Sequence, residues 1–186
     1  MSDALPVLSY DPRLSGARCD LCALGPTSPL VRYGPERPWR PVPSEFNPGA
    51  LGFMIGQSPG PDEHEGGRPW IGRAGLFLTQ MVNALGLPRG AFSYSNVDFC
   101  SPPGVATGAY ERILYRTHKH NAEERRKAKT EGRDPVLILE PHVACLPRLK
   151  EEILRYDNLV LLGGDALKGF YGDEAGITDL RGGQEL

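Results

Sequence analysis

Short apolar runs and amphipathic stretches alternate along the chain, and their order predicts its secondary structure. Residues 51–56, LGFMIG, form an apolar run closed by glycine, which is typical of a buried strand. Residues 74–85 carry apolar side chains in two neighbouring rows of i+4 spacing, which predicts an amphipathic helix ending at Gly86 and Pro88. The rows consist of Phe77, Met81 and Leu85, and of Leu78 with Val82.

The second half of the chain continues this pattern. Residues 92–99 alternate as a strand does, and residues 110–134 form a charged, helix-prone stretch. A second amphipathic helix runs from about residue 143 to 153, and residues 158–162 read as another buried strand. Asp165 is expected to cap the short helix that follows. This order predicts an α/β fold with a parallel sheet, whose loops at the strand carboxyl ends carry the binding residues.

The length and the distribution of proline predict one domain with two irregular parts. A chain of 186 residues is long enough for one core, and it has no internal repeat, so residues 1–186 are expected to form a single domain. Residues 1–48 are rich in proline and include a Cys-x-x-Cys pair, so they are expected to wrap the core irregularly. Residues 105–140 read as a charged helical insertion.

Net charge and hydropathy limit how the protein can contact nucleic acid or membranes. The net charge is −2 and the pI is about 6.1, so there is no global basic field and any contact with nucleic acid must be local. The first residues lack the basic start and apolar core of a secretory signal, and no apolar run approaches the ~20 residues that span a bilayer. These features predict a soluble, cytoplasmic protein without a membrane partner.

The cysteines form a candidate metal site. The four cysteines are too few for a disulfide-rich framework, and a cytosolic chain is not expected to form disulfides. Four thiolates can close one metal site, but only the first two show ligand spacing, so the sequence leaves zinc and an iron–sulfur cluster open. Buried thiols without a metal are the third alternative. The cysteines are Cys19, Cys22, Cys100 and Cys145.

Several motifs in the family's order resemble family 4 uracil-DNA glycosylases. Residues 56–60, GQSPG, followed by Glu63 and by residues 67–75, GRPWIGRAG, resemble the family's first motif. Residues 95–104, SNVDFCSPPG, are similar to its strand-to-cysteine segment, and residues 144–149, ACLPRL, to a helix start that carries cysteine. Two further segments match in character, namely residues 159–164 and residues 177–182.

The resemblance implies a fold, a cofactor and a substrate. It implies a three-layer α/β/α sandwich around a short central parallel sheet. It also implies a structural 4Fe-4S cluster held by Cys19, Cys22, Cys100 and Cys145, near the face that binds DNA. The expected partner is uracil-containing DNA, single- or double-stranded, with a replication or repair protein as a further partner. The implied reaction is hydrolysis of the N-glycosidic bond of uracil in base excision repair.

The reaction explains why a glycine-rich loop follows the first strand. The base must leave the helical stack and enter a closely fitting pocket. Gly56, Ser58, Pro59 and Gly60 allow the backbone to approach the flipped nucleotide. Trp70, where the family usually has Phe, is expected to cover the face of the base, and the Asn96 amide to read the uracil edge. Gln57 and Asn96 are the expected catalytic residues, with Gln57 positioning water.

Each of these residues also has a simpler interpretation. Trp70 can be an ordinary packing aromatic beside a helix start, and Asn96 can cap a turn at the end of a strand. Asp62 and Glu63 lie in a polar loop, where carboxylates are usually solvated. His64 and His142 flank loops without a required role.

The sequence departs from the family pattern at three places. Gln57 stands where the family has Glu, and a neutral amide can orient water but cannot take its proton. Glu63-His64 replaces Glu-Asp. The printed sequence ends at Leu186 without the family's His-Pro-Ser segment, so we expect one edge strand to be missing and the chain by itself to excise uracil weakly.

The charged insertion allows two roles besides a solvated helix. Its arginines and lysines can track DNA phosphates, although acidic residues dilute them. Residues 116–119, RTHK, are faintly similar to a histidine loop that traps the sugar covalently in one branch of the superfamily.

Three functions remain open from the sequence. The first is a uracil-DNA glycosylase. The second is a catalytically weak or inactive DNA-binding module of the same fold, favoured by Gln57. The third is a zinc-stabilised α/β binding protein unrelated to uracil.

Overall fold

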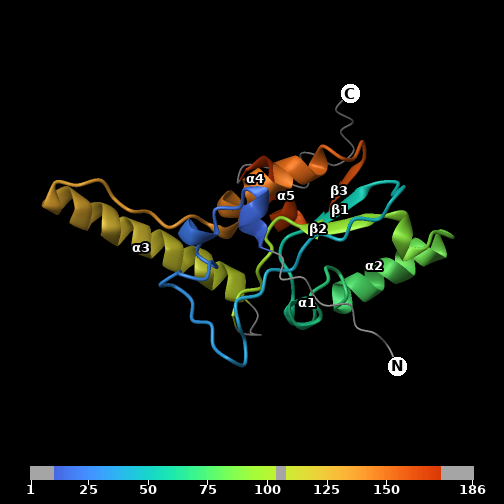
Figure 1. Cartoon of the computed structure of the whole chain (residues 1–186), viewed down its shortest axis with the longest axis horizontal. Helices are drawn as coiled ribbons and strands as arrows, with labels where there is room; N and C mark the ends of the chain where they lie inside the picture. Colours follow the sequence, from blue (N-terminus) through green and yellow to red (C-terminus); the bar gives the residue numbers. More distant parts are fainter. Residues whose placement is uncertain (1–10, 104–107, 173–186) are drawn as a thin grey trace.

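The computed structural model describes residues 11–103 and 108–172 of the chain. They form a parallel sheet with helices on both faces, an irregular N-terminal segment and a long helix that extends away from the sheet (Figure 1). The elements are η1 (Pro12–Ser15), η2 (Cys19–Leu21), β1 (Phe53–Gly56), α1 (Pro61–Gly66), α2 (Arg73–Ala84), η3 (Arg89–Ala91), β2 (Ser93–Asn96), α3 (Ala109–Glu131), α4 (Pro141–Ile153), β3 (Leu159–Leu161) and α5 (Gly164–Tyr171).

The sheet has the order β2-β1-β3, and both strand pairs are parallel. The register pairs Phe53 with Ser93 and with Leu159, and it pairs Gly56 with Asn96. The carboxyl ends of β1 and β2 therefore lie side by side. The predicted α/β class with a parallel sheet is confirmed. The expected missing edge strand concerns the chain after residue 172, which lies outside the described residues.

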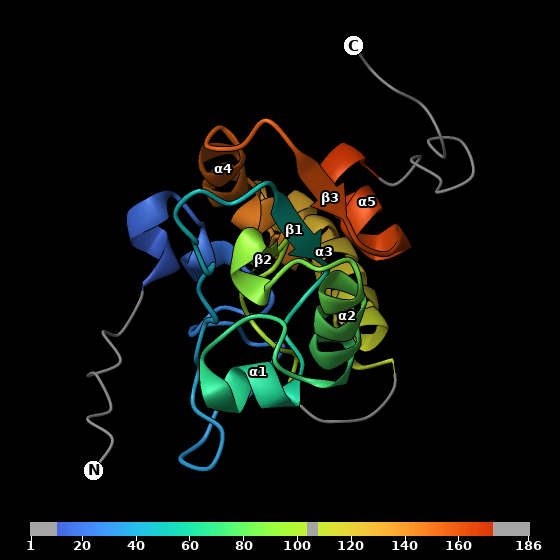
Figure 2. The ribbon, with the colours of Figure 1, turned by 90° about the vertical axis from the view of Figure 1, so that its right-hand side faces the viewer.

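Alternation along β1 divides the core into two layers. Phe53 and Ile55 pack with Leu149 of α4 and Ala166 of α5, whereas Met54 packs with Val82 of α2 on the other face. Figure 2 shows α4 and α5 on one side of the sheet and α2 on the other. Because successive side chains of a strand point to opposite faces, a single apolar run serves both layers.

A third apolar cluster joins the irregular N-terminal segment to the body. It contains Leu24 and Val31 of this segment, Cys100 after β2, Ile113 of α3 and Ala144 of α4. Within the described part of the chain, no helix is long and apolar enough to cross a membrane.

Three local expectations need correction. Residues 61–66 were expected to be loop, but they form α1. Asp165 was expected to cap α5, but the N-cap is Gly163 and no side chain caps it. On α2, the row with Val82 faces the sheet, whereas Phe77 and Met81 are 64% and 54% exposed, so the row of Phe77, Met81 and Leu85 does not contribute to the described core.

Leu149 provides a test of this core. It is fully buried between α4 and the sheet, so we expect Leu149→Ala to lower the free energy of unfolding by about 2–5 kcal/mol. Leu154, at the end of the same helix, is 85% exposed, and we expect Leu154→Ala to change the free energy by no more than about 0.5 kcal/mol. Urea denaturation measures both, and equal effects would contradict the packing of α4.

Candidate active site

A cavity of about 320 Å³ opens at the carboxyl ends of β1 and β2. It is bounded by the loop after β1, the start of α1, the start of α2 and the end of β2. Each residue that the sequence predicted for nucleotide binding or catalysis lines this cavity, namely Gly56, Gln57, Ser58, Pro59, Gly60, Trp70 and Asn96. The parallel register of β1 and β2 brings the loop after β1 and Asn96 together, and the indole of Trp70 is tied to β2 at the Ser95 carbonyl.

Gly56 allows two of these residues to meet. A Cβ at Gly56 would lie 2.5 Å from Cζ2 of Trp70 and 2.7 Å from Oδ1 of Asn96. Real Cβ atoms do not approach other heavy atoms so closely, so any larger residue would displace the indole, the amide or both. The glycine that closes the first apolar run is therefore required by close packing in the cavity wall.

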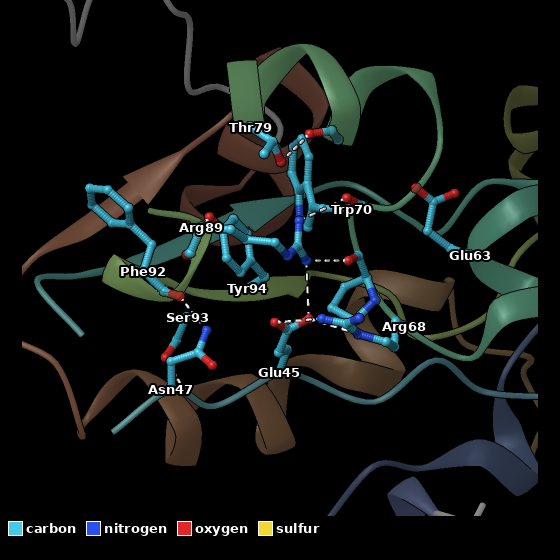
Figure 3. A network of polar contacts seen from close by, with 12 residues as sticks. Glu45, Asn47, Glu63, Arg68, Trp70, Thr79, Arg89, Phe92, Ser93 and Tyr94 are labelled. Atoms are coloured by element: carbon cyan, nitrogen blue, oxygen red, sulfur yellow. Dashed lines mark hydrogen bonds and ion pairs between the residues drawn. The ribbon is translucent and has the colours of Figure 1, made fainter. Parts of the chain in front are cut away.

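Trp70 is fixed in an unusual conformation. Its φ is 60°, which makes it the only non-glycine residue with positive φ among those the structure describes. The indole Nε1–H donates a hydrogen bond of 2.9 Å to the Ser95 carbonyl of β2. Figure 3 shows the contacts around the Trp70 backbone. Gly75 permits the close return of the chain, since a Cβ there would lie 1.9 Å from the Trp70 carbonyl oxygen.

Asn96 is the last residue of β2 and is 5% exposed. Its backbone carbonyl accepts a hydrogen bond of 2.9 Å from Nη2 of Arg148, and the same nitrogen donates to the Val97 carbonyl at 2.7 Å. Arg148 is fully buried in α4, where Nη1 is 2.8 Å from a carboxylate oxygen of Glu152. A buried ion pair thus holds the two peptide groups on either side of the Val97 Cα, directly after Asn96.

Glu63 has a structural position that the sequence analysis missed. It is 8% exposed, so the interpretation of this carboxylate as solvated is wrong. Its two oxygens accept hydrogen bonds from the backbone N–H of Gly60 at 3.0 Å and of Gly72 at 2.8 Å. Glu63 therefore ties together the two loops that border the cavity. Pro61 at the first helical position and Glu63 at the third are the sequence signal that would have found α1.

A second, smaller cavity of about 150 Å³ shares Gln57 with the first. Asp98 lines it, and the backbone N–H of Asp98 donates to the Gln57 carbonyl at 2.9 Å. Burial raises the pKa of Asp98 to about 7, although the nearby Tyr110 hydroxyl and Arg148 guanidinium lower it. Asp98 is not among the residues predicted from the sequence, since an acidic residue next to a strand usually faces solvent.

The four cysteines lie in one region and are all buried. A backbone bond of 2.9 Å from Arg18 to Ala144 and a bridge between Cys22 and Leu139 bring the Cys-x-x-Cys segment to the start of α4. Each of the six pairs of thiols interacts electrostatically. Within the described residues, however, no group of three or more His, Cys, Asp or Glu side chains is arranged to hold a metal ion.

The chemistry of these thiols fits a cationic metal centre. Burial, followed by the neighbouring Cys145, raises the pKa of Cys19 to about 12, and burial raises the pKa of Cys145 to about 11. Thiols in such surroundings stay protonated unless a cation compensates the thiolate charge. A donor set of four buried cysteines is typical of zinc or an iron–sulfur cluster.

The insertion helix α3 has few contacts with the cavity. It runs away from the sheet, and only its first residues, including Tyr110 and Glu111, line the second cavity (Figure 1). His118 lies 2.6 Å from Glu140 through Nε2, so the histidine of residues 116–119 is part of a surface contact with the segment before α4.

Gly56 provides a test of the cavity wall. We expect Gly56→Ala to lower the free energy of unfolding by about 1–3 kcal/mol because the added methyl overlaps the indole and the amide. We also expect it to shift the Trp70 fluorescence in a Trp39→Phe background. Gly34→Ala is the control, since a Cβ at Gly34 meets nothing within 4 Å. Unchanged stability and fluorescence in Gly56→Ala would contradict this geometry.

Comparison with known proteins identifies the family. The model of the family described as "Uracil DNA glycosylase superfamily" matches residues 43–184. Type-4 uracil-DNA glycosylases with similar sequences occur in Pyrobaculum aerophilum, 38% identical over 96 residues, which is 51% of this chain and 43% of the relative. The type-4 enzyme of Thermotoga maritima is 30% identical over 130 residues, which is 69% of this chain and 54% of the relative.

The relatives match only part of the chain's length, but the family model includes the residues that line the cavity. The chain spans about half the length of these curated relatives. The names of the relatives confirm the resemblance to family 4 that the motifs indicated. Since the family model extends over most of the chain, including the loop after β1 and the end of β2, the protein belongs to the uracil DNA glycosylase superfamily.

Proposed function

We propose that the chain is a uracil-DNA glycosylase that takes a flipped deoxyuridine into the cavity at the ends of β1 and β2 and hydrolyses its N-glycosidic bond. The observation that carries the proposal is the meeting of the glycine loop, an aromatic ring and a carboxamide in one cavity. An enzyme acting on a base outside the stack needs these three features, which provide close backbone approach, a stacking face and hydrogen bonds to the edge of the base.

The side chains divide the recognition of uracil between them. Trp70 offers its ring to the face of the base, because base–aromatic stacking stabilises an extruded base. The Asn96 carboxamide donates to one uracil carbonyl and accepts from the ring N–H. Cytosine presents the opposite polarity at this edge, so it would leave buried polar groups unpaired at a cost of about 1–3 kcal/mol.

Hydrolysis requires water beside the sugar and stabilisation of the charges that develop. Gln57 stands between the two cavities and can hold a water through its amide. The amide cannot remove a proton from that water or offset the charge of a cationic sugar. The contribution of Gln57 to hydrolysis is therefore limited to orienting the water.

The neutrality of Gln57 also supports the second candidate function. A domain with the same cavity and no carboxylate at this place would bind uracil-containing DNA without efficient turnover. Binding and base release must therefore be measured separately.

We further propose that Cys19, Cys22, Cys100 and Cys145 hold a 4Fe-4S cluster with a structural role. The four residues belong to the N-terminal segment, the loop after β2 and α4. A cluster would join these three parts covalently through its thiolate ligands. Support comes from the burial and mutual interaction of the thiols and from the family.

The functional test uses a single-stranded oligonucleotide with one deoxyuridine. We expect the chain to release uracil slowly, and we expect Asn96→Ala to lower the rate about tenfold to hundredfold, because the edge of the base loses its buried partner. Asn83→Ala, on the exposed side of α2, is the control. Alkaline scission of the product measures release, and an oligonucleotide with cytosine at the same place measures selectivity.

The outcomes separate the candidate functions. Preferential binding of uracil without any release would support the binding module. Equal binding of the uracil and cytosine oligonucleotides, with no release from either, would exclude both functions.

The cofactor test uses protein purified without oxygen. We expect a broad absorption band at the violet edge of the visible spectrum and close to one iron per cysteine. Cys145→Ser is expected to lose the band and lower the thermal midpoint, because one of the four ligands and its link to α4 are removed. A colourless protein that contains zinc would contradict the cluster.

A further inference from the structure

Trp70 adopts a backbone conformation that needs support from its surroundings. At φ 60° it lies in the left-handed region, which residues with a Cβ rarely occupy and which persists only where neighbouring groups enforce it. The indole is held at its far end by the bond from Nε1 to the Ser95 carbonyl. The backbone end requires a separate restraint, because the ring position depends on both φ and ψ of this residue.

Arg89 supplies a restraint on the backbone. Its Nη1 donates to the Trp70 carbonyl at 2.9 Å and its Nη2 donates to the Pro69 carbonyl at 2.8 Å (Figure 3). These carbonyls belong to the peptide groups immediately before and after the Cα of Trp70. The orientation of these two groups defines φ and ψ, so one planar guanidinium fixes both angles.

Arg89 is itself held in place. Its side chain is 21% exposed, Nη2 lies 3.0 Å from Oε2 of Glu45, and the guanidinium lies over the Tyr94 ring at 4.1 Å from its centroid. Glu45 is aligned by two backbone hydrogen bonds with Tyr94 of β2, at 2.8 and 2.9 Å. The backbone of Trp70 is therefore anchored to strand β2 through Arg89 and Glu45.

We propose that Arg89 is a positioning residue for uracil recognition, which holds the Trp70 backbone in the left-handed conformation that places the indole against Gly56 and Asn96. The proposal rests on the proposed function of the cavity. Arg89 itself does not line the cavity and is expected to act only through Trp70.

Arg68 provides a matched control in the same network. Its Nη2 lies 3.0 Å from Oε1 of Glu45, so it shares the carboxylate that Arg89 binds. Its side chain is 59% exposed, and its side-chain hydrogen bonds within the described part of the chain go to Glu45 alone. Arg68→Met therefore removes one positive charge and the contact with Glu45, as Arg89→Met does, without releasing the Pro69 and Trp70 carbonyls.

The experiment compares binding of two oligonucleotides that differ in one base. One carries 2′-fluorodeoxyuridine, whose glycosidic bond resists cleavage because fluorine destabilises a cationic sugar, and the other carries 2′-fluorodeoxycytidine. The ratio of the two dissociation constants is the uracil preference. A change in general attraction to DNA cancels in this ratio, so loss of a surface charge alone leaves it unchanged.

We expect Arg89→Met to lower the uracil preference about tenfold. Because the Asn96 amide rejects cytosine, only the uracil oligonucleotide places its base against the indole, so only its binding weakens when the ring is displaced. Arg68→Met should leave the preference within about twofold, as additive surface changes do. Arg89→Lys should fall between the parent and Arg89→Met, because an ammonium keeps the charge beside Glu45 but cannot bind both carbonyls in one plane.

A double-mutant cycle separates positioning from a general structural effect. In a Trp70→Ala background, Arg89→Met should cause no further loss of preference, because its action is exerted through the missing ring. A further tenfold loss in that background would overturn the proposal, as would equal preferences in Arg89→Met and Arg68→Met. If Arg89→Met does not fold, Arg89→Lys carries the same cycle.

Failure of the inference is distinct from failure of the proposed function. A parent chain without any uracil preference would contradict the proposed function. A parent with a clear preference that Arg89→Met retains would contradict only the role of Arg89.

Discussion

The absence of a side chain at Gly56 is the constraint on which the rest of the site depends. Gly56 ends the central strand β1 and pairs in register with Asn96, so any Cβ there would enter the space between Trp70 and the Asn96 amide. The ladder continues past the strands, because the N–H of Val97 donates to the Gly56 carbonyl at 2.7 Å. The sheet thus places the Trp70 ring and the Asn96 amide at one point, and glycine leaves room for both.

Two arginines, the fully buried Arg148 and the partly exposed Arg89, hold the cavity wall from opposite sides of the sheet. Arg89 fixes the backbone around Trp70, and Arg148 fixes the carbonyls that follow the side chain of Asn96. Each is paired with a glutamate, Glu45 or Glu152. Burying a charge is costly unless it is paired and hydrogen-bonded, so such pairs are weak sources of stability but strong restraints on geometry. Their placement behind Trp70 and Asn96 restrains both residues in the cavity wall.

The sequence predicted the sheet and the cavity lining because both follow from local patterns. Apolar runs marked the strands, and the parallel order placed the loop after β1 and the end of β2 at one edge. The resemblance to family 4 then singled out the glycine loop and Asn96 as site residues. The left-handed backbone of Trp70 has no such pattern, since it is imposed by Arg89 from a later segment. Arg148 is fully buried although charged residues in a helix normally indicate solvent, and Phe77 is exposed although its spacing matches the core row. These outcomes depend on tertiary partners that spacing does not encode.

The most direct test of this account is a titration of free uracil into nitrogen-labelled protein, followed by NMR. The account predicts that uracil shifts the backbone signal of Gly56, the indole signal of Trp70 and the side-chain amide signal of Asn96, with matching affinities, and leaves signals around Lys168 in the second cavity unchanged. Shifts confined to the second cavity, or the absence of shifts at these three groups at saturating uracil, would contradict the assignment of the cavity at the ends of β1 and β2 as the uracil site.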